Sequence, residues 1–234
     1  MYRQENNPGI RIWDIGIADY SSVLELQKSL HKKRYNDEIP DTVLILEHEQ
    51  VVTLGARESK NNLVAGPDEL AKNNIDVVQV RRGGGVTAHN PGQLVFYPVI
   101  SLKDFGLGIN EYIRTLEGIG IELLGKLGVE AKRKKGFVGL WVDDRKIASV
   151  GVRVSKQVAY HGMAVNISND LSIFDNMIPC GIDGVEMTSV LKETAKKASM
   201  EKVKNILCEI VVEKLGHGKQ AEYKKFSEIT SLAE

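Results

Sequence analysis

The chain has 234 residues, of which 42% are hydrophobic and 26% are charged, and its formal net charge is zero. These values are typical of a soluble globular protein, and they argue against nucleic acid or an anionic membrane as a partner. No apolar run reaches the length of a membrane span, and the first ten residues lack the apolar core of a signal peptide. Cys180 and Cys208 are too few for a disulfide framework, so the cytoplasm is the expected compartment.

Helix and strand patterns alternate in the first half of the chain. Apolar residues at helical spacing predict a helix over residues 19–35, with Ser21 or Ser22 as its cap. A longer helix is predicted over residues 109–127, with Gly128 placed to end it. Runs rich in β-branched residues predict strands over residues 42–46, 75–80 and 94–100.

The second half of the chain predicts a β-meander followed by a helix. Residues 140–167 contain LWV, KIASVGVRV and VAYHGMAVNI, with turn residues between them. Apolar residues at helical spacing predict the last helix over residues 200–215. Helices around these strands predict an α/β fold of the mixed α+β kind, with a mixed sheet flanked by helices. Because no linker or repeat divides the chain, we expect one domain over residues 1–234.

Cys180 stands in an unusual place for a packing cysteine. It lies between Pro179 and Gly181, which favour a turn over a helix or a central strand. Free cysteine usually packs as a small hydrophobe, so a thiol at a turn suggests chemistry.

Lys146 is the second residue of chemical interest. Strict alternation puts it on one strand face with Ala148, Val150, Val152 and Val154, so it points toward the core. Burial lowers the pKa of a lysine, which can then serve as an acid or a base. The alternative is a lysine at a strand end whose ammonium reaches water.

Residues 81–93 read RRGGGVTAHNPGQ and follow a predicted strand. Consecutive glycines let a ligand approach the backbone, and Arg82 and His89 flank them with polar side chains. The segment lacks the lysine and hydroxyl residue of a P-loop, and the alternative for His89 is a loop histidine bonded to backbone. Gly151 and Gly162 on neighbouring strands indicate either a narrow apolar slot or a bulge without a ligand. No metal site is predicted, since HExxH and CxxC are absent.

Several segments together resemble one family. RGGGVTAHNPGQL, GLWVDDRKIASVGVRV, YHGMAVNISNDLSIFDNMIPCGI and MTSV occur in the order seen in lipoate–protein ligase B, the octanoyl-[acyl carrier protein]–protein octanoyltransferases. The resemblance covers roughly residues 10–215. It implies a catalytic domain of the biotin and lipoate protein ligase type that needs no cofactor. It also implies that an octanoyl group moves from acyl carrier protein to a lysine of a lipoyl domain, as in 2-oxoacid dehydrogenase E2 subunits and the glycine cleavage H protein.

The resemblance further implies roles for individual residues. Cys180 matches the nucleophile that carries the acyl thioester, and Lys146 matches the lysine thought to lower the pKa of that thiol. Ala88 stands where the family has an aromatic residue and is expected to widen the pocket, whereas Asn90 replaces a glycine and is expected to keep the turn. The acyl-binding residues match Arg82, Gly83, Gly84, Gly85, Val86, Thr87, Ala88, His89, Ser149, Val150, Gly151, Gly162, Met163 and Ala164.

Two other functions stay open at this point. One is an ATP-dependent lipoate or biotin protein ligase of the same superfamily, which would not need Cys180 as a nucleophile. The other is a non-catalytic domain that binds acyl carrier protein or a fatty acid. The basic run Lys132 to Lys135 is a candidate docking site for an acidic acyl carrier protein, and a solvated loop is the alternative.

Overall fold

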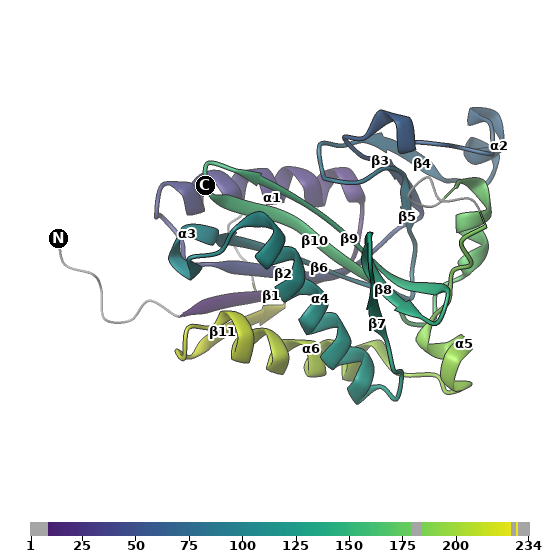
Figure 1. Cartoon of the computed structure of the whole chain (residues 1–234). Coiled ribbons are helices and arrows are strands. Elements are labelled where there is room, and N and C mark those ends of the chain that lie inside the picture. The colour runs from purple at the N-terminus through teal and green to yellow at the C-terminus, as the bar shows by residue number, and fades with distance from the viewer. Residues whose placement is uncertain (1–8, 179–183, 226–227, 229–234) are drawn as a thin grey trace.

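A large mixed sheet with helices on both faces forms the frame of the protein (Figure 1). The structure is a computed structural model, and it describes residues 9–178, 184–225 and 228. Within the described residues the sheet has eight strands, in the order β11 (Ala221–Lys225), β1 (Ile10–Ala18), β2 (Thr42–His48), β6 (Gln93–Ser101), β10 (Val158–Asn166), β9 (Arg145–Ser155), β8 (Phe137–Val142) and β7 (Lys132–Lys134).

The pairing of these strands confirms the predicted mixed sheet. Strand β1 runs parallel to both β2 and β11, and every later neighbour in the order pairs antiparallel. The predicted meander corresponds to β8, β9 and β10, which follow one another through short turns. Strands β1, β7 and β11 were not predicted from the sequence.

Helix α1 (Tyr20–Tyr35) covers one face of the sheet, and α4 (Ile109–Lys126) and α6 (Met200–Leu215) cover the other (Figure 1). All three long helices were predicted. The predicted caps of α1 are wrong, because the Asp19 carboxylate accepts a hydrogen bond from the backbone N–H of Ser22 at 2.7 Å. The short helices are α2 (Pro67–Lys72), α3 (Leu102–Phe105) and α5 (Val190–Thr194), with 3-10 turns η1 (Glu58–Lys60) and η2 (Leu171–Asn176).

A small sheet lies on the same face of the large sheet as α1. Its strands have the order β4 (Asp76–Gln79), β3 (Val51–Leu54) and β5 (Thr87–His89). Its apolar side chains pack with those of η2 in a separate buried cluster. Strand β5 is the end of the glycine-rich segment, so the small sheet fixes the position of that segment over the large sheet.

A register shift between β8 and β9 changes the direction of Lys146. Leu140 pairs with Ala148, but Trp141 pairs with Lys146, so Ile147 is an extra residue on β9. Ile147 and Ala148 are neighbours in sequence, yet both belong to the core cluster under α4 and α6. Strict alternation is therefore broken, and Lys146 lies on the opposite face from the one predicted, together with Trp141.

None of the helices in the described part of the chain combines the length and the apolar character needed to cross a bilayer.

Two glycines of α4 provide a matched test of how this helix packs on the sheet. Gly125→Ala is expected to raise the free energy of unfolding by about 0.5–1 kcal/mol, because alanine favours the helix. Its Cβ would meet nothing within 4 Å. Gly120→Ala is expected to lower it by about 1–3 kcal/mol through overpacking. There the Cβ would lie 2.7 Å from Leu140 Cδ1 and 2.8 Å from Met163 Sδ. Urea unfolding of both variants measures the difference, and equal effects would contradict this packing.

Candidate active site

Three segments that are far apart in sequence enclose one narrow cavity of about 40 Å³. They are the glycine-rich segment, the middle of β9 and the facing part of β10. Twelve of the fourteen predicted acyl-binding residues line the cavity, together with three residues that were not predicted. The lining consists of Tyr20, Arg82, Gly84, Gly85, Val86, Thr87, His89, Tyr97, Ser149, Val150, Gly151, His161, Gly162, Met163 and Ala164.

Gly83 and Ala88 are the two predicted residues that do not line the cavity. The backbone N–H of Gly83 donates to Val152 O at 2.9 Å, which ties the loop to β9. Ala88 is fully buried in the core of the small sheet, next to Val52 and Phe174 in the same cluster. The expected widening of the cavity at Ala88 is therefore not found, because its methyl group packs away from the cavity.

Asn90 keeps the turn after β5 through hydrogen bonds and not through left-handed backbone. Its Nδ2 donates to Asp170 O at 2.8 Å, and its Oδ1 accepts from Asn169 Nδ2 at 3.1 Å. The left-handed residue of this turn is Gly92, with φ of 89°.

Arg82 shapes the glycine-rich loop from inside. Its side chain is 7% exposed, and its guanidinium donates to Thr53 O at 2.9 Å, Thr53 Oγ1 at 2.7 Å and Gly85 O at 2.8 Å. A buried guanidinium with several oxygen acceptors is a strong structural element. Arg82 therefore forms part of the wall and holds the loop.

Gly151 and Gly162 bring protein segments close together. A Cβ at Gly151 would lie 3.0 Å from Arg82 Cδ and from Gly83 O, and a Cβ at Gly162 would lie 2.3 Å from Phe96 O. The two glycines pair with each other across β9 and β10. The missing side chain of Gly151 allows the glycine-rich loop to lie on β9, and that of Gly162 allows β10 to lie close to β6.

Lys146 is buried, with 1% of its surface exposed, so the alternative of an ammonium that reaches water is wrong. Its Nζ lies over the Trp141 ring, 5.6 Å from the centroid. Its backbone N–H donates to Glu186 O at 2.8 Å, and its carbonyl accepts from the N–H of Thr188 at 2.9 Å. The segment after Cys180 in the sequence is thus bonded directly to the backbone of Lys146.

Cys180, together with Pro179 and Gly181, lies outside the described residues. Ile178 and Gly184, the nearest described residues on its two sides, line one hollow of about 410 Å³ with Met187 and Phe174. The other cysteine, Cys208, is half-buried in α6, and burial raises the pKa of its thiol to about 11. A thiol with such a pKa is a poor nucleophile, so Cys208 is no rival for the role.

Hydrogen bonds join His89 in the cavity wall to the segment beside Lys146. His89 Nδ1 lies 2.7 Å from Gln93 Oε1, Gln93 Nε2 donates to Asn166 Oδ1 at 2.9 Å, and Asn166 Nδ2 donates to Thr188 O at 2.9 Å. Because the amide nitrogen of Gln93 is a donor, its oxygen is an acceptor, and His89 Nδ1 carries the proton. His89 Nε2 is then an acceptor on the ring that faces the cavity. The alternative of a loop histidine bonded to backbone is wrong.

The inner wall of the cavity is a cluster of aromatic and imidazole rings. The ring centroids of Tyr20 and His48 are 4.8 Å apart, those of His48 and His89 5.4 Å, and those of Tyr97 and His161 6.0 Å. Burial lowers the pKa of His48 to about 4 and that of His161 to about 3. Burial also lowers the pKa of His89. All three rings are therefore neutral at pH 7.

Tyr20, Tyr97 and His161 line the cavity but were not predicted to do so. Tyr20 is the first residue of a helix, and Tyr97 sits in a strand of buried apolar residues, where aromatic side chains are usually core. His161 stands immediately before Gly162, so its position in the sequence was the one signal available.

Ion pairs neutralise much of the positive charge of the basic run Lys132 to Lys135. Its residues form β7 and the start of the turn that follows. Three of them have acidic partners within 3.0 Å: Lys132 with Glu130, Arg133 with Glu117, and Lys134 with Asp144.

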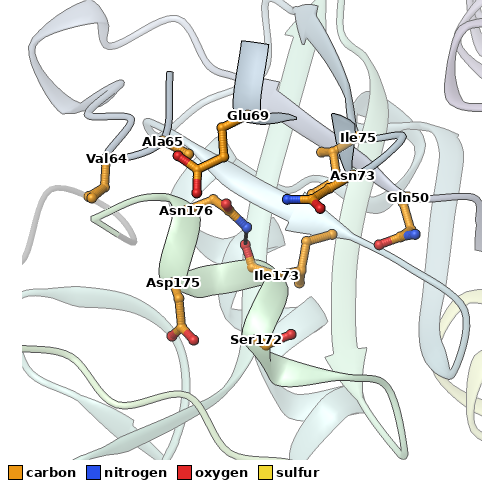
Figure 2. A pocket seen from close by; sticks show the side chains of 10 residues that line it. All are labelled: Gln50, Val64, Ala65, Glu69, Asn73, Ile75, Ser172, Ile173, Asp175 and Asn176. Atoms are coloured by element: carbon orange, nitrogen blue, oxygen red, sulfur yellow. Dashed lines mark hydrogen bonds between the residues drawn. The ribbon is translucent and has the colours of Figure 1, made fainter. Parts of the chain in front are cut away.

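A larger hollow of about 520 Å³ lies between α2 and η2, and none of the described residues predicted for the site lines it (Figure 2). Glu69 and Asn73 project into it from the α2 side, and Asn176 Nδ2 donates to Ile173 O at 3.0 Å on the other side. Its lining is polar, so it does not fit an alkyl chain. Among residues 9–178, 184–225 and 228, no three His, Cys, Asp or Glu side chains are arranged to hold a metal ion.

Protein stability is expected to fall as the pH drops from 7 to 5. The unfolded chain binds protons on its histidines near the ordinary pKa of 6.5, whereas folded His48 and His161 stay neutral to about 4 and about 3. Stability is therefore complete above pH 6.5 and decreases below it, by roughly 2 kcal/mol per histidine at pH 5. Urea unfolding followed by tryptophan fluorescence at each pH measures the change.

His48→Gln is the matched variant for this pH dependence. His48 Nδ1 lies 3.1 Å from Ala18 O and its Nε2 lies 2.9 Å from Tyr97 Oη, and a glutamine amide also offers one donor and one acceptor. The variant should lose less stability between pH 7 and pH 5 than the parent protein. A parent profile that is flat over this range would show that the histidines are not buried as neutral rings.

Comparison with known proteins agrees with this arrangement. Residues 19–211 match the family model of the lipoyl protein ligase A/B catalytic domain. The octanoyltransferase of Syntrophobacter fumaroxidans is 44% identical over 190 residues, which cover 81% of this chain and 83% of that protein. The mitochondrial octanoyltransferase of Arabidopsis thaliana is 40% identical over 195 residues, with 83% of each chain covered.

Solved structures show the same fold at low sequence identity. A putative lipoate protein ligase from T. acidophilum with bound lipoic acid superposes with a TM-score of 0.69 at 18% identity, covering 92% of this chain and 88% of that one. Lipoate-protein ligase A bound with ATP has a TM-score of 0.70 at 18% identity, with coverages of 92% and 87%. By the family model and these relatives, the chain belongs to the lipoyl protein ligase A/B catalytic domain family, within which its curated relatives are octanoyltransferases.

Proposed function

We propose that this protein is an octanoyltransferase that moves an octanoyl group from octanoyl-acyl carrier protein to a lysine of a lipoyl domain, through a thioester on Cys180. One observation carries the proposal. Twelve residues from three separate sequence segments, each predicted to bind the acyl group, line a single cavity. The octanoyltransferase relatives, at 40–44% identity over more than four fifths of the chain, support the same reaction.

The surroundings of Lys146 support its pairing with Cys180. A buried ammonium is costly unless polar or anionic groups stabilise it. Residues 186–188 are hydrogen-bonded to the backbone of Lys146, and Cys180 is only six residues before Glu186 in the sequence. In the proposal, the cation of Lys146 lowers the pKa of the Cys180 thiol and increases the fraction of nucleophilic thiolate.

The first step is a transthioesterification. The thiolate of Cys180 attacks the octanoyl thioester, a new C–S bond forms, and the bond to the carrier sulfur breaks. The carrier leaves as a thiolate and takes up one proton from the Lys146 ammonium, which leaves Lys146 neutral. One thioester replaces another, so the step is nearly isoenergetic and needs no ATP.

The second step makes the stable product. The neutral amine of the acceptor lysine attacks the Cys180 thioester, and the Cys180 thiolate leaves as the amide forms. The attacking amine must lose a proton, and Lys146 in its neutral form is the candidate base. The alkyl tail would lie against Val150, Met163 and Ala164, which give the cavity its apolar surface.

The acceptors in this proposal are lipoyl domains of 2-oxoacid dehydrogenase E2 subunits and the glycine cleavage H protein. The compartment is the cytoplasm, on the ground that a chain with two cysteines suits a reducing environment. An ATP-dependent lipoate ligase remains the alternative, because proteins of that kind share the fold. It differs in needing ATP and in not needing a thiol at Cys180.

Incubation with octanoyl-acyl carrier protein, without ATP, is expected to add one octanoyl group to Cys180. Intact-mass and peptide mass spectrometry should find an adduct that hydroxylamine removes, because thioesters are cleaved by that nucleophile. Cys180→Ser should abolish the adduct and the transfer, whereas Cys208→Ser should keep both, since Cys208 packs in α6. Full transfer by Cys180→Ser, or transfer only when ATP is present, would rule out the thioester mechanism.

Charge reversal at the basic run tests donor docking. The double variant Lys132→Glu, Lys135→Glu keeps Arg133 and its ion pair with buried Glu117. It should raise KM for the acidic carrier at low salt by roughly 3–10-fold. The rate with a small octanoyl thioester should not change. Lys196→Glu with Lys197→Glu is the control, since both side chains are exposed outside the run. An equal loss with both donors would count against docking at this surface.

A further inference from the structure

His161 has several features that set it apart from a core histidine. It is a non-glycine residue with φ of 58°, a left-handed conformation that costs energy in a strand. Its backbone N–H leaves the strand ladder and donates to Gln27 Oε1 at 2.8 Å. Only 2% of its surface is exposed, and its ring lines the cavity. The fold thus maintains an unfavourable backbone conformation to place this imidazole at the cavity.

The position of His161 follows from the register of β9 and β10. Ser149 pairs with Ala164, Gly151 with Gly162, and Val152 with His161. Along the two strands, His161 is the last cavity residue counted away from Lys146. Six residues separate Lys146 from Val152, which corresponds to roughly 15–20 Å at the rise of a β-strand. His161 therefore lies at the end of the cavity that is farthest from Lys146 along the two strands.

The polar atoms at this end have unused hydrogen-bonding capacity. His161 Nδ1 and Gln27 Nε2 are buried and have no hydrogen-bond partner among the described residues. The Gln27 amide accepts from His161 through its oxygen, so its nitrogen is a donor. Buried polar groups of this kind usually bind a water molecule or a ligand group, because leaving them unpaired is costly.

The cavity has room for a water molecule. A water molecule needs roughly 10–15 Å³ of such volume, and the cavity has about 40 Å³. Burial also keeps the His161 ring neutral, with its pKa lowered to about 3, so the end of the cavity offers hydrogen bonds and no positive imidazolium charge.

We propose that His161, positioned by Gln27, is a polar stop that binds a water molecule or a substrate hydroxyl and so limits the acyl chain to medium length. The proposal rests on the acyl transfer proposed above. A longer alkyl chain would displace the bound O–H group and leave the buried Nδ1 of His161 unpaired, which lowers affinity by roughly tenfold or more. An acyl chain with a terminal hydroxyl would replace the water and be accepted.

Binding of 8-hydroxyoctanoate and nonanoate to the full protein tests the stop directly. The two acids have the same number of chain atoms and differ in a terminal O–H or CH3 group. Isothermal titration should give the hydroxy acid an affinity equal to or higher than that of nonanoate. An apolar end would bind nonanoate at least tenfold more tightly, and this result would overturn the proposal.

Variants at His161 provide a second test of the polar stop. His161→Phe should shift the affinity ratio toward nonanoate by at least tenfold, whereas His161→Asn, which tolerates left-handed backbone and keeps polar atoms, should stay within about threefold of the parent. Tyr112→Phe is the control, because it removes an unpaired buried hydroxyl from α4, on the other face of the sheet. Equal ratios in the Phe variant and the parent would also overturn the stop.

Transfer assays separate this proposal from the proposed function. Octanoyl, nonanoyl and 8-hydroxyoctanoyl groups would be offered on the carrier protein. The predicted binding ratio without any transfer would contradict the octanoyltransferase activity and leave the stop intact. Octanoyl transfer with a tenfold preference for nonanoate over the hydroxy acid would contradict the stop alone.

Discussion

The buried guanidinium of Arg82 is the interaction on which the cavity depends. It donates to acceptors on β3 and on the glycine-rich loop, and so joins the small sheet to that loop. Gly151 then lets the loop lie directly on β9. Because the two walls of the cavity come from different sheets, neither sheet alone would form it. Arg82 fixes the loop on the small sheet, and the hydrogen bond from the Gly83 N–H to Val152 O ties that loop to β9.

Two neutral imidazoles, His89 and His161, line the cavity with His48 packed behind them, and their state follows from burial. His48, His89 and His161 each have a lowered pKa because the surrounding rings and strands exclude water. A neutral ring has one donor and one acceptor, so each nitrogen has a defined role once its partner is known. Through Gln93 and Asn166, His89 also connects the cavity to the segment beside Lys146. The position of His89 in the cavity is thus linked by hydrogen bonds to the position of the segment beside Lys146.

Much of the fold could be predicted from local patterns in the sequence, and most of the cavity lining from the resemblance of its motifs to a known family. Helical periodicity and β-branched runs identify α1, α4, α6 and the meander. The direction of Lys146 could not be predicted, because one extra residue on β9 reverses the alternation and leaves no mark in composition. The side chain of Ala88 was placed wrongly for a related reason. Ala88 lies in the three-residue strand β5, and its side chain points to the opposite face from the side chains of Thr87 and His89.

His161 shows what kind of information a sequence lacks. In a strand, a histidine beside a glycine is ordinarily a surface or core residue, and no spacing rule marks it as part of a cavity. Its significance comes from three facts that exist only in three dimensions: a left-handed backbone, a buried ring nitrogen without a partner, and a register that puts it farthest from Lys146. A site that must end after a fixed length of alkyl chain needs a structural boundary. A polar group is an effective one, because hydrocarbon cannot replace the hydrogen bonds of the water it displaces.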